Sequence, residues 1–451
     1  MQVTVRFLHL ADLHLGSPLR SISAQSEAIQ KALTDATYRA FSNAIDVAVE
    51  ESADFVVIAG DLYDRESRSI RANQFVVDQF GRLQTHDIPC YLCYGNHDPL
   101  GNRAEMLELP ENVHVFGYDD VEEAKYPIDG PAEARIFGQS YRTSSDSRRL
   151  HEGYAPPDAT IPNIGLLHTG LDPDAGKYAP CSESELRDIN NMHYWALGHI
   201  HQQRIYPGTP TIAFPGIPQG RDVTEPRTGG AYLVDLSVAQ EPTLQFVPTS
   251  PIIWHDVRVD LGDLEDQPSN VNDVERLLLE EAERLQNSAN DDHLPDLDIE
   301  PVSTDWSPEG HICRWTLVGR SDVYEVLDAE DEVDDFIAEQ LRNRFEREMP
   351  FVWTESVQNR VRQPLPNIDE IRDEDPVIQE FIDLVDEFRV DPEIRDDLGE
   401  QSGEIWFEPE DHEEERETEL PLSEDLLDEL IDRAEARVME ELIIRREYVD
   451  S

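Results

Sequence analysis

Five short polar segments of the chain carry side chains that can bind metal ions. Each follows an apolar run that predicts a buried strand, over Val5–Leu10, Phe55–Ala59, Cys90–Tyr94, Ile164–Leu167 and Tyr194–Leu197. The polar segments are Asp12-Leu13-His14, Gly60-Asp61, Gly95-Asn96-His97-Asp98, His168-Thr169 and Gly198-His199-Ile200-His201. Because such strand ends meet at one edge of a sheet, we expect two carboxylates, an amide and five imidazoles to gather there. That set suits a pair of divalent metal ions acting on a phosphate ester.

Spacing and donor type narrow the choice of metal. Asp12 and His14, like His199 and His201, stand two residues apart at a strand end, so both members of a pair should point to one side. Imidazole, carboxylate and amide donors without thiolate suit Mn²⁺, Fe²⁺ or Zn²⁺ rather than Ca²⁺ or a structural zinc. The carboxylates of Asp12 and Asp61 neutralise only part of the charge of two divalent ions. The remaining positive charge would attract a phosphodiester monoanion.

The five motifs, in their order along the chain, resemble those of the calcineurin-like metallophosphoesterase superfamily. The segments ADLHLGSPLR, IAGDLYD, YGNHDP, YWALGHIHQ and FPGIPQGRD are similar to its DNA-repair nuclease branch. More narrowly, they resemble the YhaO-type relatives of SbcD and of the Mre-eleven nuclease. The resemblance covers roughly residues 1–250. It implies an α/β fold, the four-layer α/β/β/α metallophosphatase sandwich.

The resemblance also implies a role for each motif residue. One metal ion would be held by Asp12, His14, Asp61 and His201. A second ion would share Asp61 and be held by Asn96, His168 and His199. The ring of His97 would donate a proton to the leaving oxygen, and Asp98 would orient that ring.

Less specific roles stand beside these. His97 could instead orient a ligand, and Asp98 could be a turn or helix cap. Asp64, just after the bridging Asp61, is better explained by a solvated loop than by a substrate contact. His9 has the opposite strand parity to Asp12, so we expect it to point to the other face and pack there.

The charge of the chain is extreme. There are 96 acidic residues against 37 basic ones, a net charge of −59, and only three of the basic residues are lysines. Such a composition is typical of proteins from a salt-saturated cytoplasm and indicates a halophile. We therefore attribute the negative charge first to solubility in concentrated salt, and only second to a binding partner. Intrinsic disorder explains it less well, because 39% of the residues are hydrophobic and the strand patterns are regular.

An acidic nuclease needs basic side chains where phosphates would lie. Residues 1–250 carry 34 acidic and 19 basic side chains, whereas residues 251–451 carry 62 and 18, so most of the excess lies away from the motifs. Arg221 is the best candidate for a substrate contact and Arg20 is a second. Weaker candidates for contacts to a phosphate backbone are Arg142, Arg148, Arg149 and Arg204.

The remaining composition places the chain in a reducing compartment. The four cysteines lack the pattern of a disulfide framework, and Cys90 and Cys93 would face opposite sides of a strand, so all four are expected to be small buried hydrophobes. The first motif occupies the start of the chain where a signal peptide would lie. No run of eighteen apolar residues is present, which predicts no membrane span. We expect a cytoplasmic protein.

Periodicity predicts three regions. Residues 1–250 form the dinuclear-metal phosphoesterase domain, with helices over Ser26–Glu50 and Ser69–Gln84. Residues 252–365 predict a small α+β capping or accessory domain. Residues 366–451 predict an acidic helical region, in which a solvated linker over 391–420 precedes an amphipathic helix that Ser423 would cap. That helix would pack on its own domain or dock on a partner.

Three functions of different kinds are open. The first is a Mn²⁺-dependent DNA nuclease, a 3′–5′ exonuclease with endonuclease activity as an option, working with a coiled-coil SMC-like ATPase in double-strand break repair. The resemblance implies that partner. The chain has no Walker motif of its own, so any ATP dependence would have to be supplied by another protein. The second is a phosphoesterase acting on nucleotides or phosphoproteins, and the third is a non-catalytic scaffold. The complete ligand set argues against the scaffold. A homodimer is left open.

Overall fold

The protein is described here from a computed structural model. The structure describes residues 3–19, 27–64, 69–102, 107–174, 176–264, 266–328, 332–345, 347–364 and 376–390, together with 434, 437 and 438. Contacts divide the chain into two units, Met1–Gly319 with Glu325–Arg360 and Arg320–Tyr324 with Val361–Ser451. The three regions expected from the sequence, with boundaries near 250 and 365, stay a prediction.

The first sheet of the larger unit has six strands in the order β12-β11-β1-β2-β3-β4. Their bounds are β1 Thr4–Leu10, β2 Phe55–Ala59, β3 Cys90–Cys93, β4 Val113–Val115, β11 Gly230–Ser237 and β12 Gln240–Pro248. Strands β1 to β4 are parallel, whereas β11 and β12 run antiparallel to their neighbours. Three of the five motifs therefore follow neighbouring parallel strands.

The second sheet also has six strands, in the order β5-β6-β7-β8-β10-β9. Their bounds are β5 Glu122–Tyr126, β6 Ala134–Gly138, β7 Asn163–His168, β8 Tyr194–Gly198, β9 Arg204–Tyr206 and β10 Thr211–Phe214. The central strands β6, β7, β8 and β10 are parallel. The other two motifs follow β7 and β8.

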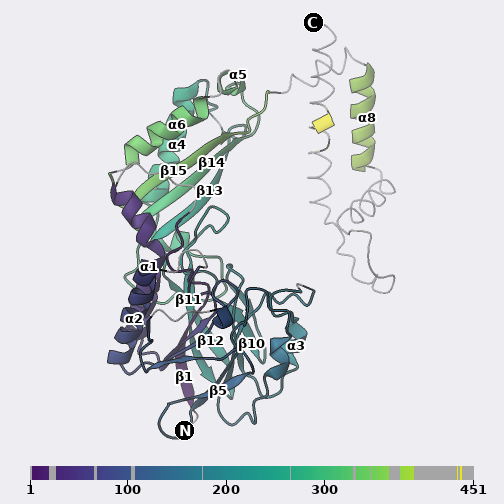
Figure 1. The fold of residues 1–451 in the computed structure, drawn as a ribbon. Helices are drawn as coiled ribbons and strands as arrows, with labels where there is room; N and C mark the ends of the chain where they lie inside the picture. Colours follow the sequence, from purple (N-terminus) through teal and green to yellow (C-terminus); the bar gives the residue numbers. More distant parts are fainter. Residues whose placement is uncertain are drawn as a thin grey trace. The chain divides into compact units, whose positions relative to one another are not determined.

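Hydrophobic packing arranges these elements in four layers (Figure 1). Side chains such as Phe7, Phe55 and Tyr194 fill the space between the two sheets. Phe41 and Phe80, from the helices α1 (Glu27–Glu50) and α2 (Ile70–Thr85), pack on the outer face of the first sheet. The short helix α3 (Glu183–Arg187) and the turns η1 (Leu100–Asn102) and η2 (Leu150–Gly153) complete this part. The predicted α/β/β/α sandwich is confirmed.

Local sequence explains where the two long helices begin and which face they bury. The side-chain oxygen of Ser69 accepts a hydrogen bond from the backbone N of Ala72 and so caps α2. The apolar stripe expected on α1 is buried, including Ala36 and Ile45. The observed helix starts are within one residue of those expected.

Strand parity also gave the correct faces. Cys90 packs toward the helices and Cys93 packs between the sheets, and all four cysteines are free and buried. His9 is buried between the sheets, where its ring nitrogens contact the hydroxyl of Tyr194 at 3.1 Å and the carbonyl oxygen of Leu197 at 3.2 Å. The expected packing roles of these residues are confirmed.

A third, smaller sheet follows in the chain. Its strands β13 (Ile252–Asp260), β14 (Gly310–Val318) and β15 (Phe351–Asn359) are parallel in sequence order. The connecting helices are α4 Val271–Gln286 and α6 Val333–Phe345, with the turn η3 Asn290–His293 and the short helix α5 Tyr324–Leu327 between strands. Trp254 and Trp353 of this sheet pack against Ile29 and Leu33 at the start of α1.

Helix α8 (Pro376–Val390) belongs to the smaller unit. The predicted linker over 391–420 and the helix start at Ser423 lie outside the described residues. Among the described helices, none combines the length and the apolar character that crossing a membrane would require.

The two large sheets approach each other so closely at the end of β8 that residue 198 must be glycine. A Cβ built on Gly198 would overlap the carbonyl oxygen of Ala59 and lie 3.0 Å from the Cβ of Ala11. We expect Gly198→Ala to lower the free energy of unfolding by about 1–3 kcal/mol, because backbone of two strands would have to shift. Chemical denaturation followed by circular dichroism measures this change.

The matched control is Gly81→Ala, in the interior of α2, where a Cβ would meet nothing within 4 Å. There the same substitution should stabilise the protein by about 0.5–1 kcal/mol, because alanine favours the helix. Equal effects of the two substitutions would contradict the close approach at Gly198.

Candidate metal centre

The motif loops meet at the carboxyl ends of β1, β2, β3, β7 and β8, and backbone hydrogen bonds tie them together. The backbone N of Asp12 donates to the carbonyl oxygen of Gly60 at 3.1 Å, and that of His14 donates to Asp61 at 3.0 Å. The backbone N of His199 donates to the carboxylate of Asp12, at 3.1 Å to Oδ1 and 2.9 Å to Oδ2. The three loops therefore hold one another in place.

Four residues at this meeting point have a left-handed backbone. The φ angles are 52° for Asp12, 43° for His14, 51° for Asp61 and 104° for His199. A residue with a side chain in this region costs about 1–3 kcal/mol, and such strain clusters at functional sites. The surrounding sheets supply the stability that keeps these side chains turned inward.

Two glycines make room for the side chains. A Cβ on Gly95 would overlap Oδ1 of Asp61 and lie 2.8 Å from Nε2 of His168. Gly60 has φ of 91°, and a Cβ there would overlap the ring of His168. The Gly in the second and third motifs is therefore needed so that His168 can reach between them.

The first group of donor atoms comes from the loops after β1 and β8. Nε2 of His14 lies 3.2 Å from Nε2 of His201 and 3.9 Å from Oδ2 of Asp61. One ligand atom from each of Asp12, His14 and His201 lies within 4.8 Å of the other two. Nδ1 of His14 is buried and finds no hydrogen-bond partner among the residues that the structure describes.

The second group lies beside the first and shares Asp61. Nε2 of His168 is 3.4 Å from Oδ2 of Asp61 and 2.9 Å from Oδ1 of Asn96. Nδ1 of His199 is 3.2 Å from the same amide oxygen. Asp61 Oδ2 therefore faces both groups, as a bridging carboxylate would.

The donor atoms fit cations rather than one another. Nδ1 of His168 must carry the proton, because it lies 2.9 Å from the carbonyl oxygen of Ala59. Its Nε2 is then a bare acceptor pointed at the oxygens of Asn96 and Asp61, which are acceptors as well. Lone pairs that converge in a buried space repel each other unless a positive ion lies among them.

Burial disfavours the charged forms of the carboxyl and imidazole groups in these donor groups. It raises the pKa of both buried carboxyls, Asp12 and Asp61, above their usual range. It lowers the pKa of His168 and of His199 to about 3, and that of His14 as well. The imidazoles are therefore neutral, which is the form that binds metal.

His97 stands at the edge of this cluster, with 38% of its side chain exposed. Its backbone N donates to Oδ1 of Asp61 at 2.9 Å, and its Nδ1 lies 2.9 Å from Oδ1 of Asp64. Asp64 also accepts a hydrogen bond from the hydroxyl of Ser17 at 3.3 Å. The hydrogen bond with Asp64 raises the pKa of His97.

Asp98, which was expected to orient His97, contacts the backbone of two motif loops. The carboxylate of Asp98 accepts hydrogen bonds from the backbone N of Tyr63 and of Gly95, both at 3.0 Å. It therefore fixes the two loops against each other, and the ring is oriented by Asp64, which sequence reasoning left to a solvated loop. The signal was its place three residues after Asp61.

A second carboxylate that the sequence did not reveal lies behind His201. Oε1 of Glu225 is 2.6 Å from Nδ1 of His201, so Nε2 of that ring turns toward His14. Burial opposes the protonation of His201, but the hydrogen bond with Glu225 and the charges of Asp12 and Glu225 together outweigh it and raise the pKa of His201. Glu225 has no motif around it, and among 96 acidic residues nothing in the sequence singled it out.

Two of the arginines that were expected to contact substrate form ion pairs with acidic side chains of the protein. Arg221 reaches the cluster, with Nη2 at 3.3 Å from Nδ1 of His201, but it is paired with Glu225 at 3.1 Å. Arg148 is paired with Asp146, and Arg20 lies outside the described residues. The described arginines Arg221 and Arg148 are thus paired with acidic side chains of the protein itself.

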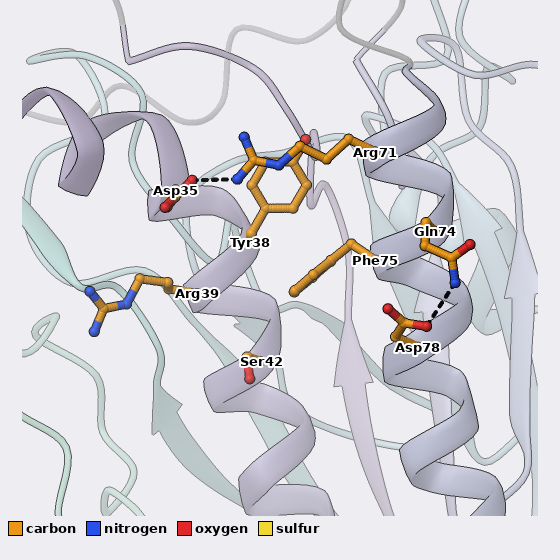
Figure 2. Close-up of a pocket in the computed structure, with 8 residues that line it drawn as sticks. All are labelled: Asp35, Tyr38, Arg39, Ser42, Arg71, Gln74, Phe75 and Asp78. Carbon is orange, nitrogen blue, oxygen red and sulfur yellow. Dashed lines mark hydrogen bonds and ion pairs between the residues drawn. The ribbon is translucent and has the colours of Figure 1, made fainter.

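A cavity of about 480 Å³ lies between α1 and α2, the two helices that cover the outer face of the first sheet (Figure 2). It contains the ion pair of Arg71 with Asp35 and the ring of Phe75. None of the motif residues lines it. The metal-binding side chains and this cavity are therefore separate features.

The comparison with known families agrees with the geometry. The family model of calcineurin-like phosphoesterases matches residues 5–203, the span that holds all five motifs. Residues 5–203 are a calcineurin-like phosphoesterase domain. The candidate clusters of the domain are thus those of a hydrolase family that uses divalent metals.

The chain is also similar to proteins of known sequence. It is 34% identical over 264 residues to YhaO of Bacillus subtilis, described as an uncharacterized metallophosphoesterase, covering 58% of this chain and 64% of that protein. It is 27% identical over 273 residues to the DNA double-strand break repair protein Mre11 of Aeropyrum pernix, covering 57% and 64%. The chain thus spans less than two thirds of either relative.

Among solved structures, a dimetal phosphatase from Danio rerio is similar with 12% identity and a TM-score of 0.33, covering 54% of this chain and 99% of that one. This likeness is too low to support an argument about function.

The contact between Glu225 and His201 makes a testable prediction. Glu225→Gln removes the charge that fixes the tautomer of His201, so affinity for divalent metal should fall about 10–100-fold. Metal titration followed by calorimetry measures the loss. The control is Glu122→Gln. Glu122 also faces a histidine, with Oε2 at 3.8 Å from Nε2 of His114, but this pair lies outside the motifs. If both substitutions leave metal affinity unchanged, His201 is not a ligand.

Proposed function

We propose that the phosphoesterase domain is a two-metal phosphodiesterase that cleaves DNA. One observation carries the proposal: Oδ2 of Asp61 faces two adjoining groups of bare imidazole, carboxylate and amide donors. Similarity to repair proteins named Mre11 supports DNA as the substrate.

The proposed ligands follow the two groups of atoms. Asp12, His14 and His201 hold one ion, and Asn96, His168 and His199 hold the other, with Asp61 shared. Two divalent ions, for which we propose Mn²⁺, would supply a nucleophile at neutral pH and clamp the attacking and leaving oxygens. Imidazole and carboxylate donors together suit Mn²⁺, Fe²⁺ and Zn²⁺.

The protein's own part in the reaction centres on His97. Its Nδ1 is engaged by Asp64, so its Nε2 is left to face the substrate. The raised pKa keeps the ring protonated to higher pH, as a general acid for the leaving oxygen requires. The backbone N of the same residue binds Asp61, which keeps the ring beside the shared carboxylate.

The charge of the site favours a diester over a monoester. The proposed ligands include two carboxylates, Asp12 and Asp61, and Arg221 is offset by Glu225. Two divalent ions against two carboxylates leave a charge of about +2, which a hydroxide nucleophile would reduce to about +1, and this matches a monoanionic phosphodiester better than a dianionic monoester. The acidic remainder of the chain needs salt screening for DNA to approach, since the Debye length falls to about 3 Å at 1 M salt.

The biological setting is proposed on resemblance alone. A nuclease of this kind would take part in double-strand break repair in the cytoplasm, as a 3′–5′ exonuclease with a coiled-coil ATPase as partner. Arg20 and Arg221 stay proposed substrate contacts. The alternative is a phosphoesterase for small nucleotides or phosphoproteins, which the 34% identity to YhaO, an uncharacterized metallophosphoesterase, leaves open.

The substrate proposal is tested by direct competition. Purified full chain with Mn²⁺, assayed from low to molar KCl, should release nucleotides from linear DNA faster than it hydrolyses cyclic nucleotides or phosphopeptides. Asp61→Asn is the control, because it should lose both ions and all activity. Equal or faster turnover of the small substrates would favour the alternative function.

The role of His97 gives a further prediction. His97→Asn should lower kcat about 10²–10⁴-fold, the usual share of a general acid, while metal content stays near that of the unmutated protein. Loss of metal would instead make His97 a ligand, since its ring also lies in a donor group with His14 and Asp64.

Asp64→Asn separates positioning from binding in the same assay. The asparagine keeps a contact to Nδ1 but loses the charge that raises the pKa of His97. The pKa should fall, so the alkaline limb of the pH–rate profile should move to lower pH with little change in KM. A profile that does not move would show that Asp64 leaves the acid unaffected.

A further inference from the structure

Three histidines outside the phosphoesterase motifs meet in the junction between the third sheet and the catalytic core. They come from different elements: His255 from β13, His293 from η3 and His311 from β14. One ring nitrogen from each lies within 4.8 Å of those of the other two. Nε2 of His255 and Nδ1 of His311 are 3.0 Å apart.

Two of the three histidines are buried, His255 is partly exposed, and hydrogen bonds fix the backbone of His293. His293 is 5% exposed and His311 is 1% exposed, which leaves little solvent to compete for their ring nitrogens. Both the backbone N and the hydroxyl of Thr228 donate to the carbonyl oxygen of His293, at 3.3 and 2.8 Å. The hydroxyl of Ser288 lies 2.9 Å from Nε2 of His293. The rings are thus preorganised.

The donor type indicates the ligand. Three imidazoles without a carboxylate or thiolate form a nitrogen-rich site, which suits Zn²⁺, Cu²⁺ or Ni²⁺ and disfavours Mg²⁺ and Ca²⁺. Burial lowers the pKa of all three rings, to about 4 for His255 and about 2 for His311, so they are neutral, as ligands must be. The charge of Asp292, beside His293, acts on that ring and would offset part of an ion's charge.

We propose that His255, His293 and His311 bind one transition-metal ion, of which Zn²⁺ is the expected example. Three imidazoles leave one tetrahedral position, which water or the hydroxyl of Ser288 can fill. This site differs from the catalytic centre in its donors, because the latter includes two carboxylates and an amide.

The position of the cluster gives the ion a structural task. Trp254, which precedes His255, donates from its ring to the carbonyl oxygen of Gly220 at 2.9 Å, and its own carbonyl accepts from Arg227. Gly220 and Arg227 flank the segment that carries Glu225, the partner of His201. An ion that joins β13, β14 and η3 would therefore brace the loop behind the catalytic centre.

The alternative is a metal-free cluster held by hydrogen bonds. One tautomer lets His255 donate a hydrogen bond to His311 or accept one from it, and the hydroxyl of Ser288, which donates to the carbonyl oxygen of Leu285 at 2.6 Å, can accept a hydrogen bond from Nε2 of His293. That arrangement satisfies one nitrogen on each ring without an ion, so metal counting separates the two.

The experiment uses the full chain with the catalytic centre disabled by Asp12→Asn and Asp61→Asn together. After chelation, the protein is dialysed against Zn²⁺ and its bound metal is counted, with and without His293→Gln. We expect His293→Gln to remove one Zn²⁺ per chain. The control His114→Gln, at a half-buried histidine of β4, should remove none. Co²⁺ in place of Zn²⁺ should give the visible absorption of a four-coordinate ion, lost in His293→Gln.

A direct measurement covers the case in which His293→Gln does not fold. Crystals of the unmutated full chain grown with Zn²⁺ should show an anomalous peak at the zinc edge between the three rings. Absence of that peak at saturating Zn²⁺, or an unchanged metal count in folded His293→Gln, overturns the proposal. Because the counting uses a chain without a working catalytic centre, its failure leaves the proposed nuclease activity untouched.

Discussion

The structure depends on the convergence of buried lone pairs around Asp61. Its Oδ2 lies 3.4 Å from Nε2 of His168 and 3.9 Å from Nε2 of His14, and all three side chains are buried. Neutral imidazoles and a buried carboxylate that face one another in this way are stable together only with a cation among them. Much of the fold can be understood as the scaffold that enforces this arrangement.

Two features of the backbone show what the enforcement costs. Asp12, His14, Asp61 and His199 adopt left-handed conformations, and Gly60 and Gly95 give the ring of His168 its room. Each strained residue costs about 1–3 kcal/mol, which the large core between and around the sheets must offset. The sheets in turn approach closely because Gly198 has no side chain. The geometry of the candidate metal centre and the packing of the core therefore depend on each other in this domain.

The acidic composition becomes understandable at the centre itself. Glu225 orients His201 and neutralises Arg221, and the hydrogen bond with Asp64 raises the pKa of His97. Both are acids acting on bases rather than on substrate. The three-histidine cluster differs, because no acid is a donor there and burial is the largest influence on the charge of each ring. Two sites in one chain would then select metals by donor type, with mixed oxygen and nitrogen donors in one and nitrogen donors alone in the other.

The sequence by itself determined the layers and the meeting place of the motifs. Alternation and apolar runs placed the strands to within a few residues, and strand parity gave the faces of Cys90, Cys93 and His9, because these depend on local periodicity. Tertiary structure alone decided which acid serves which base. Asp64 reaches His97, and Glu225 reaches His201 from 24 residues away in the chain. Pairings of this kind depend on how loops from separate strands cross, and no spacing rule encodes that.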